Sequence, residues 1–241
     1  MRYAIGEIVL VVIGILIALQ INNWNEENTI QENITSQLSA LISDLQRDKF
    51  AYDDVRGFHA FRVHAVYYLI KQYGLAKDPV LFTEAGDLPA MDQEGSFRGP
   101  VPDTYDQQFV IRSFSWLLRY IHMTPRINTM EEFKNTGLLA HFKNKDLKTK
   151  ILDYYDRTTF AFDGDDRDTN PTEMLKKIFT AKGFAYTDAA VLEHPLETFL
   201  SHPEIRAILI NIVDESTYRA NMSGYMADQI EHLIQELESE I

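Results

Sequence analysis

The sequence YAIGEIVLVVIGILIALQI, residues 3–21, is the most informative stretch of this chain. Residues 8–19 within it are apolar except for Gly14, and Glu7 is its one charged residue. A helix needs about 20 residues to cross the hydrocarbon core of a bilayer, and this stretch has that length. Trp24 follows at a position that suits an aromatic anchor at the membrane–water interface. We therefore predict a transmembrane anchor within residues 1–24.

A cleaved signal peptide is the main alternative, because Arg2 provides a short basic segment before the apolar core. Signal cleavage requires small residues at the cut, whereas residues 19–22 read LQIN. The sequence therefore favours a retained anchor.

The orientation of the anchor follows from its flanking charges. Arg2 precedes the span, and no Lys or Arg follows it before Arg47. The positive-inside rule then places the N-terminus in the cytoplasm and residues 25–241 outside it. For a bacterial inner membrane, this means an exported domain in the periplasm.

Four residues of the span are candidate functional positions. Glu7 is one, because ionisable groups in a span are costly and often functional. It also lies close enough to the helix start to reach the cytoplasmic interface, so an interfacial or packing role stays open. Gly6, Gly14 and Ala18 are small residues on roughly one helix face, where a second helix can pack closely. Their other interpretation is ordinary membrane-helix composition.

The composition of the chain restricts its function. Among 241 residues, 36 are acidic and 23 basic, which gives a net charge of −13 and makes nucleic-acid binding improbable. The absence of cysteine excludes disulfides, thiolate nucleophiles and Cys-ligated zinc. A hydrophobic fraction of 45% is sufficient for a folded core.

The pattern of residues 25–241 predicts an all-α, multi-helix bundle with long, stalk-like first and last helices. Residues 75–103 contain too many prolines and glycines for a helix and are predicted to form an irregular loop. The predicted helices are an amphipathic continuation of the span through Ile34, Leu38, Leu41 and Leu45; residues 55–73; residues 105–122; a short helix opened by Thr129 and Glu132 and ended by Gly137; residues 145–160, capped by Asn144; residues 171–181, capped by Asn170; and a last helix, capped by Ser201 and reaching Glu238.

No stretch of the chain carries a recognisable catalytic, cofactor or metal motif. The acidic segment 163–170 lacks the glycine and the bidentate glutamate of a calcium loop, and the histidines do not have zinc-site spacing. Four arginines lie on helices rich in aromatic residues, where they suit either a carboxylate ligand or intramolecular ion pairs. They are Arg56, Arg62, Arg112 and Arg119. In the last helix, Ser216, Arg219 and Ser223 form a polar interruption.

Two stretches resemble a known family. YAIGEIVLVVIGILIALQINNWNE at the N-terminus and MEEFKNTGLLAHFKNKDLKTKILDYY at residues 130–155 are similar to stretches of uncharacterised single-span proteins, a domain-of-unknown-function family common in Bacteroidota. The resemblance implies an inner-membrane protein with an exported helical domain, and it implies no activity.

The leading hypothesis is therefore a non-enzymatic, membrane-anchored protein that assembles with copies of itself or with other membrane proteins, as an oligomeric scaffold or a subunit of an envelope complex. Two alternatives stay open. One is an exported sensor domain that binds a small anion with residues 75–103 and the nearby arginines. The other is an ion-linked membrane oligomer that uses Glu7.

Overall fold

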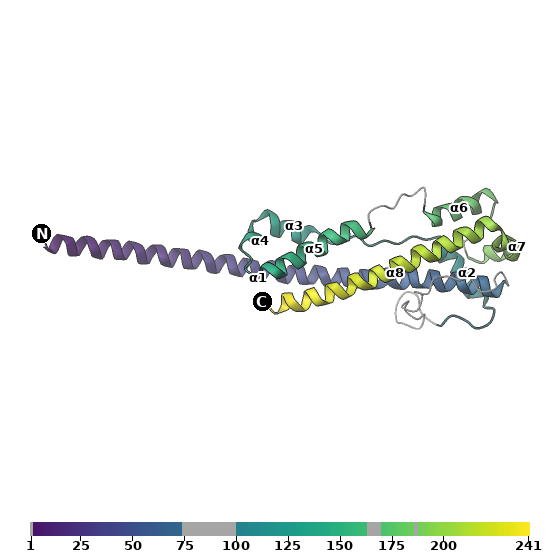
Figure 1. The fold of residues 1–241 in the computed structure, drawn as a ribbon, viewed down its shortest axis with the longest axis horizontal. Coiled ribbons are helices and arrows are strands. Elements are labelled where there is room, and N and C mark those ends of the chain that lie inside the picture. The colour runs from purple at the N-terminus through teal and green to yellow at the C-terminus, as the bar shows by residue number, and fades with distance from the viewer. Residues whose placement is uncertain (1, 74–99, 163–169, 186–187) are drawn as a thin grey trace. The chain divides into compact units, whose positions relative to one another are not determined.

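The computed structural model describes residues 2–73, 100–162, 170–185 and 188–241, and all secondary structure in these ranges is helical (Figure 1). The prediction of an all-α fold with long first and last helices is confirmed. Most of the predicted loop 75–103 and of the acidic segment 163–170 lies outside the described residues.

Helix α1, Arg2–Gln72, is one continuous helix of 71 residues. The sequence predicted two helical stretches here, and the structure joins them. No proline lies between them, and Gly57 is accommodated within the helix. The predicted boundary between anchor and exported domain, after Trp24, falls inside this helix without a break.

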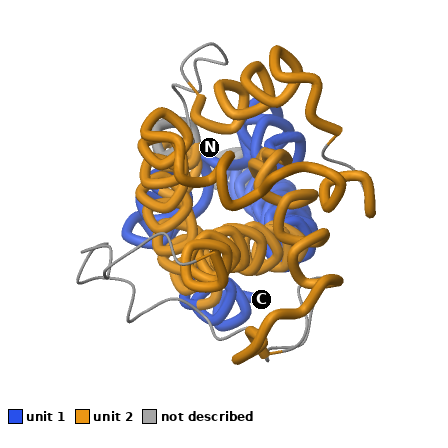
Figure 2. The backbone as a smooth tube through the Cα atoms, turned by 90° about the vertical axis from the view of Figure 1, so that its right-hand side faces the viewer, with its two compact units in different colours: residues 1–46, 126–153, 232–241 blue, residues 47–125, 154–231 orange. Residues whose placement is uncertain are grey.

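The chain divides into two compact units (Figure 2). Unit 1 contains residues 1–46, 126–153 and 232–241, and unit 2 contains residues 47–125 and 154–231. Helices α1, α5 (Lys145–Phe162) and α8 (Pro203–Glu238) contribute residues to both.

Unit 1 joins α1 to the short helices α3 (Asn128–Asn135) and α4 (Leu138–His141), the start of α5 and the end of α8. Apolar side chains from all of these segments are buried, and each such side chain contributes about 1.5–3 kcal/mol of stability. They include Ile34, Leu38, Leu41, Leu45, Met130, Phe133, Leu139, Leu147, Ile151, Leu233 and Leu237.

Two of the three helix-end predictions in unit 1 are confirmed. Asn144 caps α5, because its Oδ1 accepts a hydrogen bond from the amide of Leu147 at 3.0 Å. Gly137 ends the preceding helix in the left-handed conformation, with φ of 76°. The prediction that Thr129 opens α3 is wrong, since its hydroxyl donates to Oδ2 of Asp44 at 2.5 Å.

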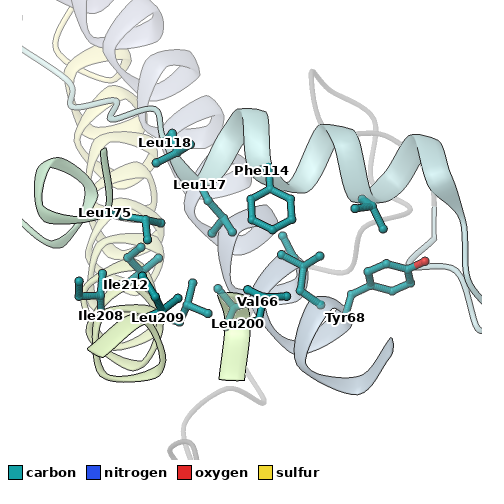
Figure 3. Packing of buried hydrophobic residues seen from close by; sticks show 14 of the residues in the cluster. Val66, Tyr68, Phe114, Leu117, Leu118, Leu175, Leu200, Ile208, Leu209 and Ile212 are labelled. Atoms are coloured by element: carbon teal, nitrogen blue, oxygen red, sulfur yellow. The ribbon is translucent and has the colours of Figure 1, made fainter. Parts of the chain in front are cut away.

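Unit 2 packs the second part of α1 against α2 (Gln107–Leu117), α6 (Pro171–Ala181), the 3₁₀ helix η2 (Asp188–Glu193), α7 (Leu196–Ser201) and α8. Figure 3 shows the centre of its core, where Phe114 and Leu117 of α2 lie near Val66 of α1. Leu200 of α7 and Ile212 of α8 belong to the same cluster (Figure 3).

Helix α8 runs antiparallel to α1 in unit 2. Nζ of Lys49 lies 3.6 Å from Oε2 of Glu231, and Arg56 lies against Gly224. The second contact lies seven residues later in α1 and seven residues earlier in α8 than the first, which fixes the register of the two helices. On this register, Arg62 of α1 lies opposite Tyr218 of α8.

Three local predictions for unit 2 differ from the structure. The helix predicted for residues 105–122 ends at Leu117, and the sequence did not predict η2 or α7. Ser201 does not cap α8, because it ends α7 and its hydroxyl donates to the carbonyl of Thr198. Asn170 does cap α6, accepting from the amide of Thr172 at 2.8 Å.

Candidate functional site

The apolar segment of α1, residues 9–24, is exposed along its whole length. Its large apolar side chains have exposed fractions from 47% at Ile13 to 71% at Leu10, and Trp24 is 65% exposed. A continuous apolar surface of this kind is unfavourable in water. The described part of the chain leaves this segment uncovered.

This part of α1 is the one described helix that is long and apolar enough to cross a membrane. None of its most apolar window is buried within the fold. Length and composition are properties that a membrane anchor shares with a signal sequence.

The predicted residues of the span lie on this exposed helix. The side chain of Glu7 is exposed, and no atom lies within 4 Å of the position that a Cβ on Gly14 would occupy. At about 100° per residue, Gly14 and Ala18 each lie within about 20° of the direction of Glu7 around the helix. The side-chain surroundings of Gly6 are outside the described residues. Their roles in packing or ion binding stay predictions.

The four predicted arginines of unit 2 have different environments. Arg62 is fully buried, and Arg56 lies against Gly224. The Cζ of Arg112 lies 5.2 Å from the ring centroid of Phe109. The Cζ of Arg119 lies 4.5 Å from the ring of Trp116. The Cζ of Arg62 also lies 5.7 Å from the ring centroid of Phe58, so three of the four guanidinium groups have cation–π contacts with aromatic rings.

Arg62 belongs to a buried polar cluster, which we define as His59 and Arg62 of α1 with Glu215 and Arg219 of α8. His59 and Arg62 are fully buried, and Arg219 is 8% exposed. Nε of Arg219 donates to Oε1 of Glu215 at 3.0 Å, an i,i+4 pair along α8. The cluster thus holds two guanidinium groups and one carboxylate.

The contacts of Arg62 satisfy only part of its guanidinium group. Its Nη2 donates to the hydroxyl of Thr172 at 2.5 Å and to the carbonyl of Leu117 at 3.4 Å. Among the described residues, its Nε and Nη1 have no hydrogen-bond partner. Burying such groups without partners is unfavourable, so Arg62 lowers the stability of the core.

The electrostatics of the cluster follow from its burial. Burial lowers the pKa of Arg62 to about 10, against the opposing effect of Glu215. Burial and the positive charge of Arg62 lower the pKa of His59 well below its ordinary value. His59 is therefore neutral near pH 7, and its Nε2 lies 3.1 Å from the carbonyl of Ile121 as a donor.

Sequence reasoning found only part of this cluster. It identified Arg62 as a possible ligand-binding group and the residues around Arg219 as a polar interruption. It did not identify His59 and Glu215 as members of the same cluster. The i,i+4 spacing of Glu215 and Arg219 was an available signal, but the antiparallel contact with α1 was not visible in the sequence.

No group of three or more potential metal ligands occurs in the part of the chain that the structure describes. The acidic residues 163–168, which the sequence analysis tested as a calcium loop, lie outside that part.

Comparison with known proteins gives a match to a protein family. Residues 7–81 match the model of DUF6090, a family of unknown function. Neither a curated protein nor a solved structure matches the chain. The matched range contains the apolar segment and α1 from Glu7 to its end, and it does not include the second resembling stretch, residues 130–155. The N-terminal part of this chain is thus similar to an uncharacterised family.

Proposed function

We propose that this chain is a non-enzymatic, single-span envelope protein that assembles with copies of itself or with other membrane proteins. In this proposal, α1 crosses the bacterial inner membrane with its N-terminus in the cytoplasm, and residues 25–241 form a periplasmic helical domain. The exposed apolar segment of α1 is the observation that supports it most directly.

One further observation favours assembly. Glu7, Gly14 and Ala18 share one face of the span, where a neighbouring helix can approach closely and pair with the carboxylate. The bilayer covers the apolar side chains of a span, but its hydrocarbon core provides no partner for a carboxylate that lies within it.

Membrane placement is tested with cysteine labelling, because the natural chain has no cysteine. A Ser36→Cys variant places a thiol on the exposed surface of α1 beyond the span. We expect a membrane-impermeant maleimide to label this variant in intact spheroplasts and the protein to stay in membranes after alkaline carbonate extraction. Labelling only after lysis contradicts the proposed orientation, and carbonate release contradicts the anchor.

Assembly is tested by mild detergent extraction from native membranes, followed by mass determination and identification of the chains that co-purify. A Gly14→Leu variant puts a large side chain on the face of Glu7, whereas Val12→Phe enlarges a residue on the opposite side of the helix. We expect the first variant to reduce assembly and the second to leave it unchanged. A solitary monomer for the natural chain, in detergent and in crosslinked cells, refutes the proposal.

A further inference from the structure

A cavity of about 400 Å³ opens on one side of α2 in unit 2. Its α2 residues recur at steps of three and four, so the helix presents them on one face. The volume is within the range of small-molecule sites, roughly 300–1,000 Å³. Its lining includes Pro102, Gln108, Phe109, Arg112, Ser115 and Trp116.

Arg112 brings a positive charge to this cavity. Its Cζ lies 5.2 Å from the ring of Phe109 and 5.7 Å from the ring of Phe61. Among the described residues it forms no hydrogen bond or ion pair, and its Nε is buried without a partner. Asp106 also lines the cavity, but its Oδ1 accepts from the amide of Phe109 at 2.8 Å as the cap of α2.

The aromatic wall of the cavity is held by the core behind it. The ring of Trp116 lies edge-on to Phe58, with centroids 5.7 Å apart, and 6.5 Å from Phe61. Phe58 and Phe61 are both fully buried. Since these contacts fix the ring of Trp116, the wall exists before any ligand binds, and ligand binding does not have to order it.

We propose that this cavity binds a small organic monocarboxylate with a planar apolar body. Arg112 pairs with the carboxylate, and the side chains of Ser115 and Gln108 lie close enough to the cavity to add hydrogen bonds. The apolar body lies against Phe109 and Trp116.

A monocarboxylate fits the charge of the site better than a phosphate or a dicarboxylate does. One guanidinium group lines the cavity and Asp106 lies beside it, so a second negative charge on the ligand has no cation to meet. The net charge of −13 on the chain further disfavours multivalent anions. This inference is independent of the proposed assembly, because it concerns only residues of unit 2.

The chain itself provides the reporter for a test. It has two tryptophans, Trp24 and Trp116, so the full-length Trp24→Phe protein in detergent reports on the cavity alone. We expect benzoate to change the fluorescence of Trp116 with a saturable dependence on concentration. Benzamide has the same shape without the charge, and we expect it to bind roughly 10- to 100-fold more weakly.

Two substitutions separate specific binding from general attraction to a cation. Arg112→Gln removes the guanidinium group that we propose pairs with the carboxylate, and we expect it to weaken benzoate binding by roughly 10- to 100-fold. Arg119→Gln removes another guanidinium group that stacks on Trp116 but does not line the cavity, and we expect it to leave binding unchanged.

A third variant protects the test against a folding defect. Ser115→Leu fills the cavity and leaves Arg112 in place, and we expect it to weaken benzoate binding as well, with far-ultraviolet circular dichroism as the check of folding. The proposal is overturned if benzoate gives no saturable signal, if benzamide binds equally well, or if Arg112→Gln retains binding. It is also overturned if Arg119→Gln loses binding to the same extent.

Discussion

Replacing Arg62 by methionine is expected to stabilise unit 2, although it removes a charged side chain from the centre of the core. Methionine is long, flexible and apolar, so it can follow the path of the arginine stem without burying a charge. The present arginine leaves two nitrogen atoms without partners among the described residues. The substitution removes that cost together with the hydrogen bonds to Thr172 and Leu117.

The size of the effect follows from the pKa of the guanidinium group. Burial lowers the pKa of Arg62 to about 10, from an ordinary arginine value above 12. At about 1.4 kcal/mol for each pH unit, the charged form is unfavourable in the folded state by about 3 kcal/mol. Losing two hydrogen bonds costs about 1 kcal/mol each. The net expectation for Arg62→Met is a gain of about 1 kcal/mol, or a rise of roughly 2–4 °C in Tm.

The assay is unfolding of the full-length protein in detergent, monitored by circular dichroism. Arg47→Met is the control, because it replaces an exposed arginine of α1. Glu215→Gln removes the one carboxylate of the cluster and is expected to destabilise by about 2 kcal/mol, since two buried cations then lack compensation. Arg62→Met should recover most of that loss. A loss of more than about 2 kcal/mol for Arg62→Met alone would falsify this account of the cluster.

Three further predictions follow from buried groups and one helix cap. The pKa of His59 is lowered in the folded state, so the free energy of unfolding should fall as the pH drops below the ordinary histidine pKa of about 6.5. The loss should be at most about 1.4 kcal/mol per pH unit. His59→Gln should flatten this pH dependence in acid unfolding curves. Burial raises the pKa of Tyr52, so the free energy of unfolding should fall as the pH rises above about 10, the ordinary tyrosine pKa. Tyr52→Phe should reduce this loss in alkaline unfolding curves. An unchanged curve would contradict the raised pKa of Tyr52. Asn144→Ala removes the cap of α5 and should cost about 1 kcal/mol in denaturant unfolding, whereas Asn33→Ala at an exposed position of α1 should cost less than about 0.5 kcal/mol.

The accuracy of the sequence predictions depended on the range of the interaction that formed each feature. Asn144 and Asn170 cap helices as predicted, because the amides that they bind lie two or three residues away in the chain. Thr129 and Ser201 have the same local pattern, but neither caps the helix that it was predicted to cap. For Thr129, a carboxylate from a distant part of α1, Asp44, accepts its hydroxyl hydrogen.

The candidate sites show the same division. The exposure of residues 9–24 could be predicted, because a continuous apolar run without polar alternation has no face to turn toward a small bundle. The cavity beside Arg112 could not be located, since its wall depends on contacts of Trp116 with Phe58 and Phe61. Those residues are more than fifty positions away in the chain.

The sequence by itself determined that the chain is helical, where several helices are capped, and that its N-terminal segment is apolar enough to cross a membrane. These properties arise from residues that are neighbours in the chain, so spacing and side-chain type are sufficient to specify them. Only the tertiary structure decided that His59, Arg62, Glu215 and Arg219 meet in one cluster and that two units form from separate segments of the chain. The antiparallel contact of α1 with α8 brings these residues together, and the register of that contact depends on side-chain packing between segments more than a hundred residues apart.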